Sequence, residues 1–156
     1  DSVEAMIRDA VARGAEVLAG GQRPEGMEEG VYLRPTILAE ADNNARICRE
    51  EVFGPVLVVL PFDSEEEVVA MGNDNDYGLA CGIYTRDFPK AWRVGRAIEA
   101  GTVWVNTYKQ FSISTPFGGV KDSGLGREKG REGIRAWMAQ KSFYVDLPGR
   151  PHPWAA

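Results

Sequence analysis

The sequence predicts an α/β fold with a mainly parallel sheet, and three observations support this class. Apolar segments typical of buried strands lie at residues 56–62, 79–85 and 102–106. Helical patterns separate them, and strand–helix–strand–helix–strand at this spacing indicates parallel strands joined by right-handed crossovers. A length of 156 residues, 44% of them hydrophobic and 26% charged, also suffices for one domain with a sizeable core.

The N-terminal part has a less regular pattern. Apolar residues at helical spacing predict an amphipathic helix over residues 2–13. A short apolar segment follows at residues 16–19. Residues 30–38 alternate in character, but Pro35 has no backbone N–H to donate, so we expect an edge or irregular strand there.

Both crossover helices have recognisable start residues. Ser64 and Glu67 form a capping-box pattern, which predicts a helix over residues 65–73. Asp87 is suited to cap the start of the next helix, with Pro89 in its first turn.

Gly101 is suited to the C-terminal cap of that second crossover helix, and the chain changes character only after the strand at residues 102–106. Residues 107–127 form an aperiodic loop rich in aromatic residues and glycine. A helix is expected over residues 128–140. The segment 141–147, KSFYVDL, alternates as an edge strand does, and an unpaired edge favours association.

Composition argues against several functional classes. The net charge of −5 does not favour a nucleic-acid surface, and acidic residues interrupt the basic cluster at 121–135. The longest apolar run, residues 56–60, is too short to cross a bilayer. Two cysteines indicate no disulfide framework, so we expect a reducing, cytoplasmic setting.

Several candidate sites also fail on residue type and spacing. His152 is the single histidine, which argues against a Ser-His-Asp triad and a His-ligated metal site. Cys81 lies within an apolar strand and is interpreted as a buried core residue. In the glycine-rich stretch, Leu125 stands where a Walker loop needs lysine, and Lys129 where a dinucleotide fingerprint needs glycine. We therefore predict neither a metal nor a phosphate loop.

Two adjacent glutamates precede the predicted strand at residues 56–62. Glu50 and Glu51 are followed by Phe53, a Gly-Pro turn and an almost wholly apolar segment. An unpaired carboxylate out of water is costly, so a polar partner is expected near them.

Three ordered segments resemble the C-terminal part of the aldehyde dehydrogenase superfamily. They are EEVFGPVL at 50–57, AGTVWVNTY at 100–108 and TPFGGVKDSGLGREKG at 115–130, and YGLACGIYTRD at 77–87 fits too. The resemblance implies an incomplete three-layer α/β fold with a mainly parallel sheet and helices on both faces.

The same resemblance divides the chain into three parts. Residues 1–140 would be the C-terminal part of the catalytic domain, residues 141–147 an oligomerisation strand and residues 148–156 a tail. A homo-oligomer, either a dimer or a tetramer, is therefore expected.

The resemblance also implies cofactor-binding residues. Glu51 would accept hydrogen bonds from the two ribose hydroxyls beside the nicotinamide of NAD or NADP, since two carboxylate oxygens match two adjacent donors. Phe53 would pack against the nicotinamide ring. A surface glutamate beside a core phenylalanine is the alternative from residue type alone.

Aromatic residues of the long loop would form part of the aldehyde site. Phe111 and Phe117 would flank the substrate, with Tyr108 as a further candidate, unless these rings fill the core instead. Glu128 matches a glutamate discussed as a proton relay in the family, and stabilising a helix start through the macrodipole is its alternative role.

The implied reaction is oxidation of an aldehyde to a carboxylic acid through a cysteine thiohemiacetal and thioester. The nucleophilic cysteine, the general base and the dinucleotide domain would lie outside this chain, so neither Cys48 nor Cys81 is assigned as nucleophile. The isolated fragment should be inactive. A non-catalytic subunit-interaction module and an unrelated small α/β binding domain remain as alternatives, and the aldehyde and the choice between NAD and NADP stay open.

Overall fold

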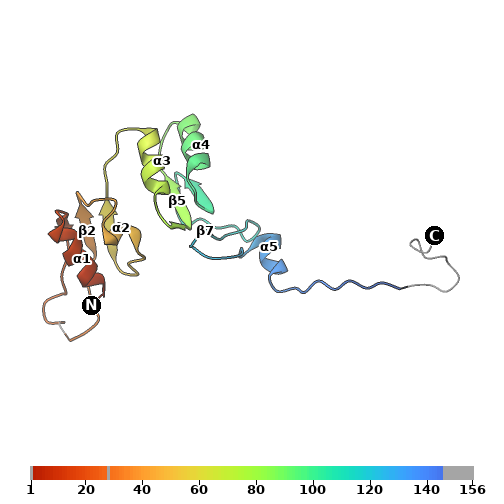
Figure 1. The fold of residues 1–156 in the computed structure, drawn as a ribbon, viewed down its shortest axis with the longest axis horizontal. Coiled ribbons are helices and arrows are strands. Elements are labelled where there is room, and N and C mark those ends of the chain that lie inside the picture. Colours follow the sequence, from red (N-terminus) through yellow and green to blue (C-terminus); the bar gives the residue numbers. More distant parts are fainter. Residues whose placement is uncertain (1, 28, 146–156) are drawn as a thin grey trace.

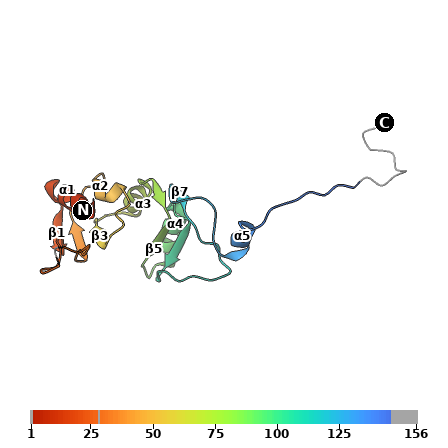
Figure 2. The ribbon, with the colours of Figure 1, turned by 90° about the horizontal axis from the view of Figure 1, so that it is seen from below.

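The structure is a computed structural model that describes residues 2–27 and 29–145. The described chain is elongated (Figures 1 and 2). An N-terminal unit of helices and strands is followed by a second unit, and the chain then leaves α5 as an extended segment.

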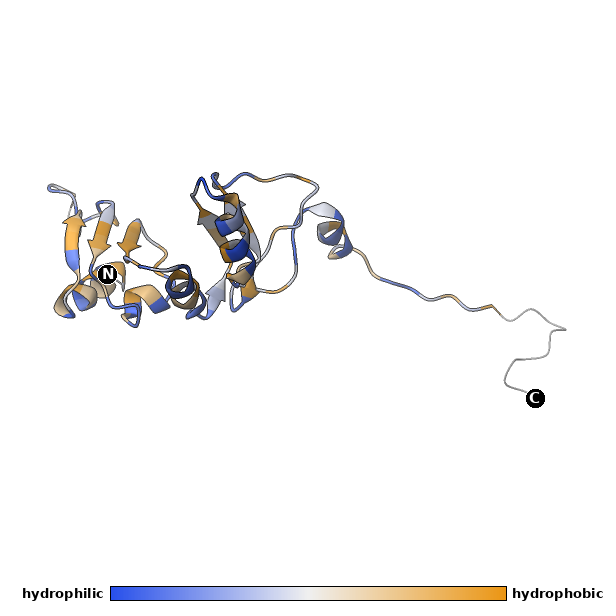
Figure 3. Ribbon diagram, turned by 90° about the horizontal axis from the view of Figure 1, so that it is seen from above, coloured by the Kyte–Doolittle hydropathy of each residue, from blue (hydrophilic) through white to orange (hydrophobic). Residues whose placement is uncertain are grey.

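The N-terminal unit is a three-stranded sheet covered by two helices. Its strands β1 (Glu16–Ala19), β2 (Thr36–Ala39) and β3 (Val56–Val59) lie in the order β1-β2-β3. Strand β2 pairs antiparallel with β1 and parallel with β3. Helices α1 (Ser2–Ala12) and α2 (Arg46–Arg49) lie together on one side of these apolar strands (Figure 3).

The core of the chain lies in this unit. Leu38 of β2 is fully buried, at 0% exposure, and packs among the apolar faces of α1 and α2. The Thr36 hydroxyl is also buried, but it donates to the Arg34 carbonyl at 2.8 Å and accepts from the Gly21 N–H at 2.9 Å. Its burial is therefore compensated by hydrogen bonds.

The expectation for residues 30–38 was partly wrong. An irregular segment does occupy their first part, but a regular strand begins at Thr36, directly after Pro35, and it is the central strand of its sheet. Pro35 lies outside the ladder, so its missing N–H breaks no strand pairing.

The second unit contains the predicted crossover. Strand β5 (Ala80–Ile83) pairs parallel with β6 (Thr102–Val105), and helix α4 (Phe88–Ala97) connects them. Helix α3 (Glu65–Asn73) contacts α4, and a small antiparallel pair joins β4 (Tyr77–Gly78) to β7 (Val120–Lys121). The α/β class and the predicted parallel pairing of β5 with β6 are confirmed.

One connection was predicted incorrectly. The strand at residues 56–62 is shorter than expected and pairs with β2, not with β5, so the described strands form three small sheets. Apolar patterning indicates that a strand is buried, but it does not specify which strand it pairs with.

The helix starts agree closely with the sequence. Helix α3 spans Glu65–Asn73 as predicted, and the Ser64 hydroxyl accepts from the Glu67 N–H at 3.1 Å. The Glu67 carboxylate accepts in return from the Asp63 N–H at 2.7 Å. Asp87 caps α4 by accepting from the Lys90 N–H at 2.9 Å.

The role expected for Gly101 was wrong, because α4 ends at Ala97 and its C-cap, Ile98, has an extended backbone and not a left-handed one. Gly101 is needed instead for close backbone packing. A Cβ built on it would lie 1.8 Å from the Gly118 carbonyl oxygen, and one built on Gly78 would lie 2.2 Å from the Glu99 carbonyl oxygen. Three motif segments thus meet backbone to backbone at glycines.

The C-terminal helix is shorter than predicted. Helix α5 spans Gly130–Arg135, whereas the pattern indicated residues 128–140. Trp137, 92% exposed, contacts little of the described chain, and short helices need tertiary packing to persist. Residues 141–145 form no strand, and residues 146–147, the tail and His152 lie outside the described residues, so the oligomerisation strand stays a prediction.

Large apolar side chains are exposed along the chain. At least 90% of the residue surface is exposed at three of them, Val31, Phe53 and Leu125, which is unusual for a folded domain. None of the described helices is long and apolar enough to cross a membrane.

Candidate functional site

Glu51 lies at an open hollow where the two units meet. The hollow has a volume of about 630 Å³ and is lined from the segment after α2, the end of α3, strands β4 and β5, the segment after α4 and the turn after β7. Apolar and polar residues share its wall, including Met71, Tyr77, Cys81 and Asp122. A group bound here would contact four separate parts of the sequence: residue 51, residues 71–81, residues 98–100 and residues 122–123.

The two adjacent glutamates have different surroundings. The Glu50 carboxylate accepts from Arg46 Nε at 2.9 Å, across one turn of α2. The Glu51 carboxylate has no hydrogen bond or ion pair within residues 2–27 and 29–145. The polar partner expected from the sequence is therefore present for Glu50, while Glu51 has both oxygens available to a ligand.

Phe53 has an unusual backbone and an exposed ring. Its φ is +49°, a left-handed value that is uncommon outside glycine, and its side chain is 90% exposed. Val52 and Val56 on either side pack against the core. The left-handed turn thus directs the Phe53 ring outward between two anchored valines, and strain of this kind often occurs at functional sites. Phe53 itself does not line the Glu51 hollow.

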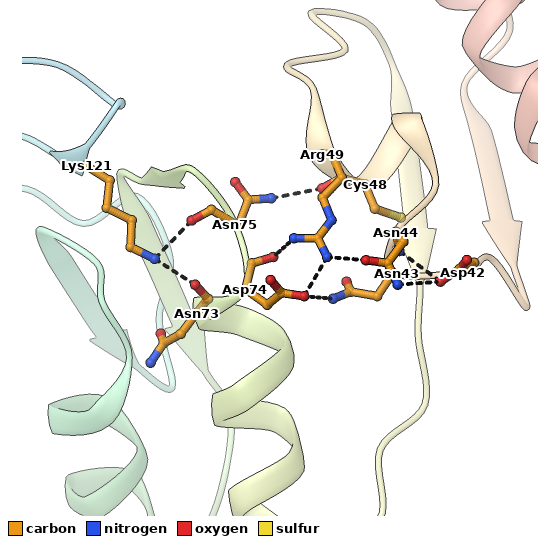
Figure 4. A network of polar contacts seen from close by, with 9 residues as sticks. All are labelled: Asp42, Asn43, Asn44, Cys48, Arg49, Asn73, Asp74, Asn75 and Lys121. Atoms are coloured by element: carbon orange, nitrogen blue, oxygen red, sulfur yellow. Dashed lines mark hydrogen bonds and ion pairs between the residues drawn. The ribbon is translucent and has the colours of Figure 1, made fainter.

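A polar network holds the segment that carries Glu51 (Figure 4). Arg49 donates to the carboxylate and the carbonyl of Asp74 and to Asn44 Oδ1 at 2.6 Å. Asn75 Nδ2 donates to the Cys48 carbonyl at 2.9 Å. The Arg49 hydrogen bond lowers the pKa of Asp74, so this carboxylate stays ionised well below neutral pH.

Neither cysteine is suited to nucleophilic attack. Partial burial raises the pKa of both the Cys48 and the Cys81 thiol, so each is protonated at neutral pH. Cys81 is half-buried at the Glu51 hollow and not fully buried as expected.

The aromatic residues of the long loop form one cluster. The Phe111 and Phe117 rings lie edge to face with centroids 4.9 Å apart. Trp104 of β6 contacts Phe111 at 5.3 Å and Tyr108 at 5.2 Å, and its indole N–H donates to the Gln110 carbonyl at 2.8 Å. We call these four residues the aromatic cluster: Trp104, Tyr108, Phe111 and Phe117.

Two residues at the aromatic cluster, Trp104 and Lys129, were not predicted from the sequence. Trp104 lies at its centre. Its position near the end of strand β6, just before a loop rich in aromatic residues, was a sequence feature that could have identified it. Lys129 was noted only for failing a glycine motif, yet its Nζ lies 3.8 Å from the Phe111 ring centroid and 5.9 Å from that of Phe117. These distances are typical of cation–π contacts.

A second open hollow, of about 1270 Å³, lies beside the aromatic cluster. Phe117, Glu128 and Lys129 line it, whereas Phe111 does not. Glu128 is joined to Phe117 by two backbone hydrogen bonds of 2.8 and 2.7 Å. Helix α5 begins only at Gly130, after the Lys129 N-cap, so Glu128 lies outside the helix whose start it was expected to stabilise.

The two hollows adjoin. Leu79 and Ser123 belong to the walls of both. The unpaired Glu51 carboxylate and the Phe117 ring therefore face neighbouring spaces separated by these two side chains. Within the described residues, no group of three His, Cys, Asp or Glu side chains could hold a metal ion.

A comparison with protein-family models decides the relationship. The model described as the aldehyde dehydrogenase family matches residues 1–143. This chain belongs to the aldehyde dehydrogenase family. The resemblance inferred from the ordered sequence segments is thereby confirmed.

Individual aldehyde dehydrogenases show how much of the family this chain represents. It is 40% identical over 154 residues to the chloroplastic betaine aldehyde dehydrogenase of Beta vulgaris, covering 99% of this chain but 31% of that protein. It is 42% identical over 147 residues to the betaine aldehyde dehydrogenase of Cereibacter sphaeroides, covering 94% of this chain and 30% of the relative. The chain thus spans about a third of the length of these curated relatives.

Solved aldehyde dehydrogenase structures share the fold. An aldehyde dehydrogenase of Mycobacterium tuberculosis complexed with NAD+ superposes with a TM-score of 0.85 at 41% identity, covering 96% of this chain and 31% of that one. Betaine aldehyde dehydrogenase of Staphylococcus aureus in complex with NAD+ gives a TM-score of 0.87 at 35% identity, with 98% and 31% covered.

Proposed function

We propose that this chain is the C-terminal part of an NAD(P)+-dependent aldehyde dehydrogenase that oxidises an aldehyde to a carboxylic acid. The observation that carries the proposal is the unpaired Glu51 carboxylate, which lines a hollow adjoining the aromatic hollow. Family membership and the NAD+ complexes of the solved relatives support it.

Glu51 and Phe53 are the proposed cofactor-binding residues. Two free carboxylate oxygens fit a pair of vicinal ribose hydroxyls, each of which donates one hydrogen bond. The exposed Phe53 ring offers an apolar face to a flat heterocycle. When bound, the nicotinamide accepts a hydride from the substrate carbon. The choice between NAD and NADP is not fixed by these two residues.

Phe111 and Phe117 are proposed to form part of the aldehyde-binding wall. Their edge-to-face contact, with Trp104 behind Phe111, makes a rigid apolar surface rather than two separate rings. Glu128, exposed at the adjoining hollow, is proposed as a proton relay because a solvated carboxylate there can exchange protons with water. Its competing role at the helix start loses support because α5 begins two residues later.

The rest of the machinery is proposed to come from outside the chain. A thiolate attacks the aldehyde, hydride leaves the resulting thiohemiacetal, and water hydrolyses the thioester to the acid. With Cys48 and Cys81 protonated, this chain supplies binding surfaces and no nucleophile, so we expect it to be inactive by itself. The solved and curated relatives are named for betaine aldehyde and for indole-3-acetaldehyde, so similarity alone does not single out one aldehyde.

Assembly and location are proposed from the same relationship. We infer a homo-oligomer, because the described part of the 141–147 segment is exposed and unpaired, with Phe143 at 83% and Tyr144 at 91% exposure. We infer a cytoplasmic protein without nucleic-acid or membrane partners from its charge and its cysteine content.

A neighbouring-residue comparison tests the proposal in the whole protein. Glu51→Gln should raise the KM for NAD+ by about 10- to 100-fold, because hydrogen bonds to a charged group contribute about 1.5–3 kcal/mol. Glu50→Gln removes the same charge from the adjacent position, where Arg46 is its partner, and should leave that KM nearly unchanged. Equal effects of the two substitutions, or no aldehyde-dependent reduction of NAD(P)+ by the unmodified protein, would contradict the proposal.

A further inference from the structure

The loop at residues 73–76 connects three parts of the molecule (Figure 4). The Asn73 side chain donates to the Ala97 carbonyl and accepts from the Glu99 N–H, both at 2.8 Å, so the loop is fixed to the end of α4. Lys121 of β7 donates to the carbonyls of Asn73 and Asn75 at 2.7 and 2.9 Å. The loop is thus held firmly within the second unit.

The same loop reaches the first unit through three pairs of residues, the longest contact being the 3.5 Å hydrogen bond from Asn43 Nδ2 to the Asp74 carboxylate. Asp74 binds the Arg49 guanidinium, and Asn75 Nδ2 donates to the Cys48 carbonyl at 2.9 Å. Cys48 and Arg49 lie at the end of α2, three and two residues before Glu51. These contacts therefore connect the second unit, which supplies most of the Glu51 hollow, with the backbone that carries Glu51.

Glu51 depends on this backbone for its position. Its side chain makes no hydrogen bond within the described residues, so no contact of its own holds the carboxylate in place. The segment after α2 runs from Glu50 to Pro55 without helix or strand pairing. The carboxylate is therefore placed by what fixes the backbone on either side of it, the end of α2 before it and the core-packed Val52 after it.

Asn75 is itself oriented by a second hydrogen bond. Its Oδ1 accepts from the Tyr77 N–H at 2.8 Å, which leaves Nδ2 to face the Cys48 carbonyl. Both polar atoms of the amide are therefore used, and each has a distinct partner. An acceptor in place of Nδ2 would face the carbonyl oxygen and repel it.

We propose that Asn75 is a positioning residue that sets the place of the Glu51 carboxylate for the cofactor ribose. This inference rests on the proposed function of Glu51. Asn75 acts through the Cys48 carbonyl, and the Asp74–Arg49 pair reinforces the same connection. Asn75 also lines the Glu51 hollow, but both polar atoms of its amide are used by Cys48 and Tyr77, so its role is to position Glu51 and not to bind the ribose directly.

The substitution Asn75→Asp isolates this connection in the whole protein. It keeps an oxygen for the Tyr77 N–H and replaces only the donor that faces Cys48. We expect the KM for NAD+ to rise about tenfold, the size of one lost hydrogen bond, while kcat and the melting temperature change little. Asn44→Asp is the matched control, because it adds the same charge nearby and also loses one amide donor, here toward Asp42 at 3.3 Å, but keeps the acceptor for Arg49; it should leave the KM unchanged.

A double substitution separates positioning from general stability. On a Glu51→Gln background, Asn75→Asp should add less than a twofold further increase in KM, because the carboxylate it positions is gone. A purely structural role would instead lower the melting temperature and the active fraction with the KM unaffected, or give additive effects on KM, and either result would overturn the inference.

A fallback variant and a comparison of the single variants separate failure of this inference from failure of the proposed function. If Asn75→Asp does not fold, Asn75→Ser decides, since its hydroxyl can accept from Tyr77 but is too short to reach Cys48; an unchanged KM there refutes positioning. If Glu51→Gln raises the KM and Asn75→Asp does not, only this inference fails. If Glu51→Gln has no effect on NAD+, the proposed function fails as well.

Discussion

A Cβ atom added to Gly101 would lie 1.8 Å from the carbonyl oxygen of Gly118. This contact is backbone against backbone, so no flexible side chain can move aside. Gly101 also donates its N–H to the Gly78 carbonyl at 3.0 Å, which fixes the close approach. The glycines of the AGT, YGL and FGG segments are therefore required by packing.

We predict that Gly101→Ala destabilises the protein by about 1–3 kcal/mol or more, because overpacking at a rigid site forces the backbone to shift. Chemical unfolding monitored by circular dichroism would measure the change. Gly95→Ala, within α4, is the matched control. Its Cβ would make only ordinary contacts with the Val103 and Ile83 side chains, at 3.4 and 3.5 Å, so the substitution should be neutral or stabilising. The same loss at both positions would refute the packing argument.

The ion pair between Glu4 and Arg23 should make stability depend on pH. Arg23 Nε and Nη2 donate to the two Glu4 oxygens at 2.9 and 3.0 Å, and these hydrogen bonds lower the pKa of Glu4 from 4.5 to about 2. A carboxylate with a lowered pKa in the folded state stabilises the fold above its unfolded value. That contribution is therefore present above about pH 4.5 and is lost as the pH falls toward 2.

Thermal unfolding from pH 7 to pH 2 would test this. The melting temperature of the unmodified protein should exceed that of Glu4→Gln by a constant amount above pH 5, and the difference should shrink between pH 4.5 and 2. Glu16→Gln removes a carboxylate without an ion-pair partner in the described chain and should show a much smaller pH dependence. A Glu4→Gln difference that grew on acidification would contradict the sign of the effect.

Lys129 should influence which aldehydes are accepted, given the proposed function. Its ammonium already lies over the Phe111 ring, 3.8 Å from the centroid, and a second cation at this wall would be repelled. We predict that Lys129→Met raises kcat/KM for betaine aldehyde about tenfold relative to a neutral aldehyde of similar size. Arg131→Met, which removes a cation from the same hollow without ring contact, serves as the control. A uniform change across both aldehydes would exclude this electrostatic role.

The exposed C-terminal segment should promote association. Phe143, Tyr144 and Val145 are 83%, 91% and 63% exposed and have no pairing partner in the described chain. We predict that the chain forms dimers or larger species in light scattering, because an exposed apolar segment without a pairing partner can add as a strand to another chain. Deleting residues 141–147 should shift the distribution toward monomer. A monomer at high concentration with the segment intact would contradict the prediction.

The sequence predicted the local structure of the second unit well, because its signals are local. The caps at Ser64 and Asp87 depend on residues three positions apart, and both were confirmed. The partner of β3 could not be predicted, since apolar patterning is the same whichever strand lies beside it. Gly101 was assigned to a helix cap because its true contact, Gly118, lies 17 residues away along the chain.

The candidate site was predicted by resemblance more than by pattern. From residue type alone Glu51 was indistinguishable from Glu50, and only the folded structure shows that Arg46 is the partner of Glu50 and not of Glu51. Trp104 and Lys129 were missed because aromatic and cationic contacts across a loop leave no fixed spacing. The roles of Glu51, Phe53, Phe111, Phe117 and Glu128 remain predictions.

The sheet order β1-β2-β3 leaves the outer side of β3 without a neighbour in the described chain, and β5 and β6 have only each other. Such rows of free amides and carbonyls are receptive to a complementary polypeptide. Given the proposed function, the segments that supply the nucleophile and the dinucleotide domain should bind this chain by strand addition at these edges when they are produced separately and mixed with it.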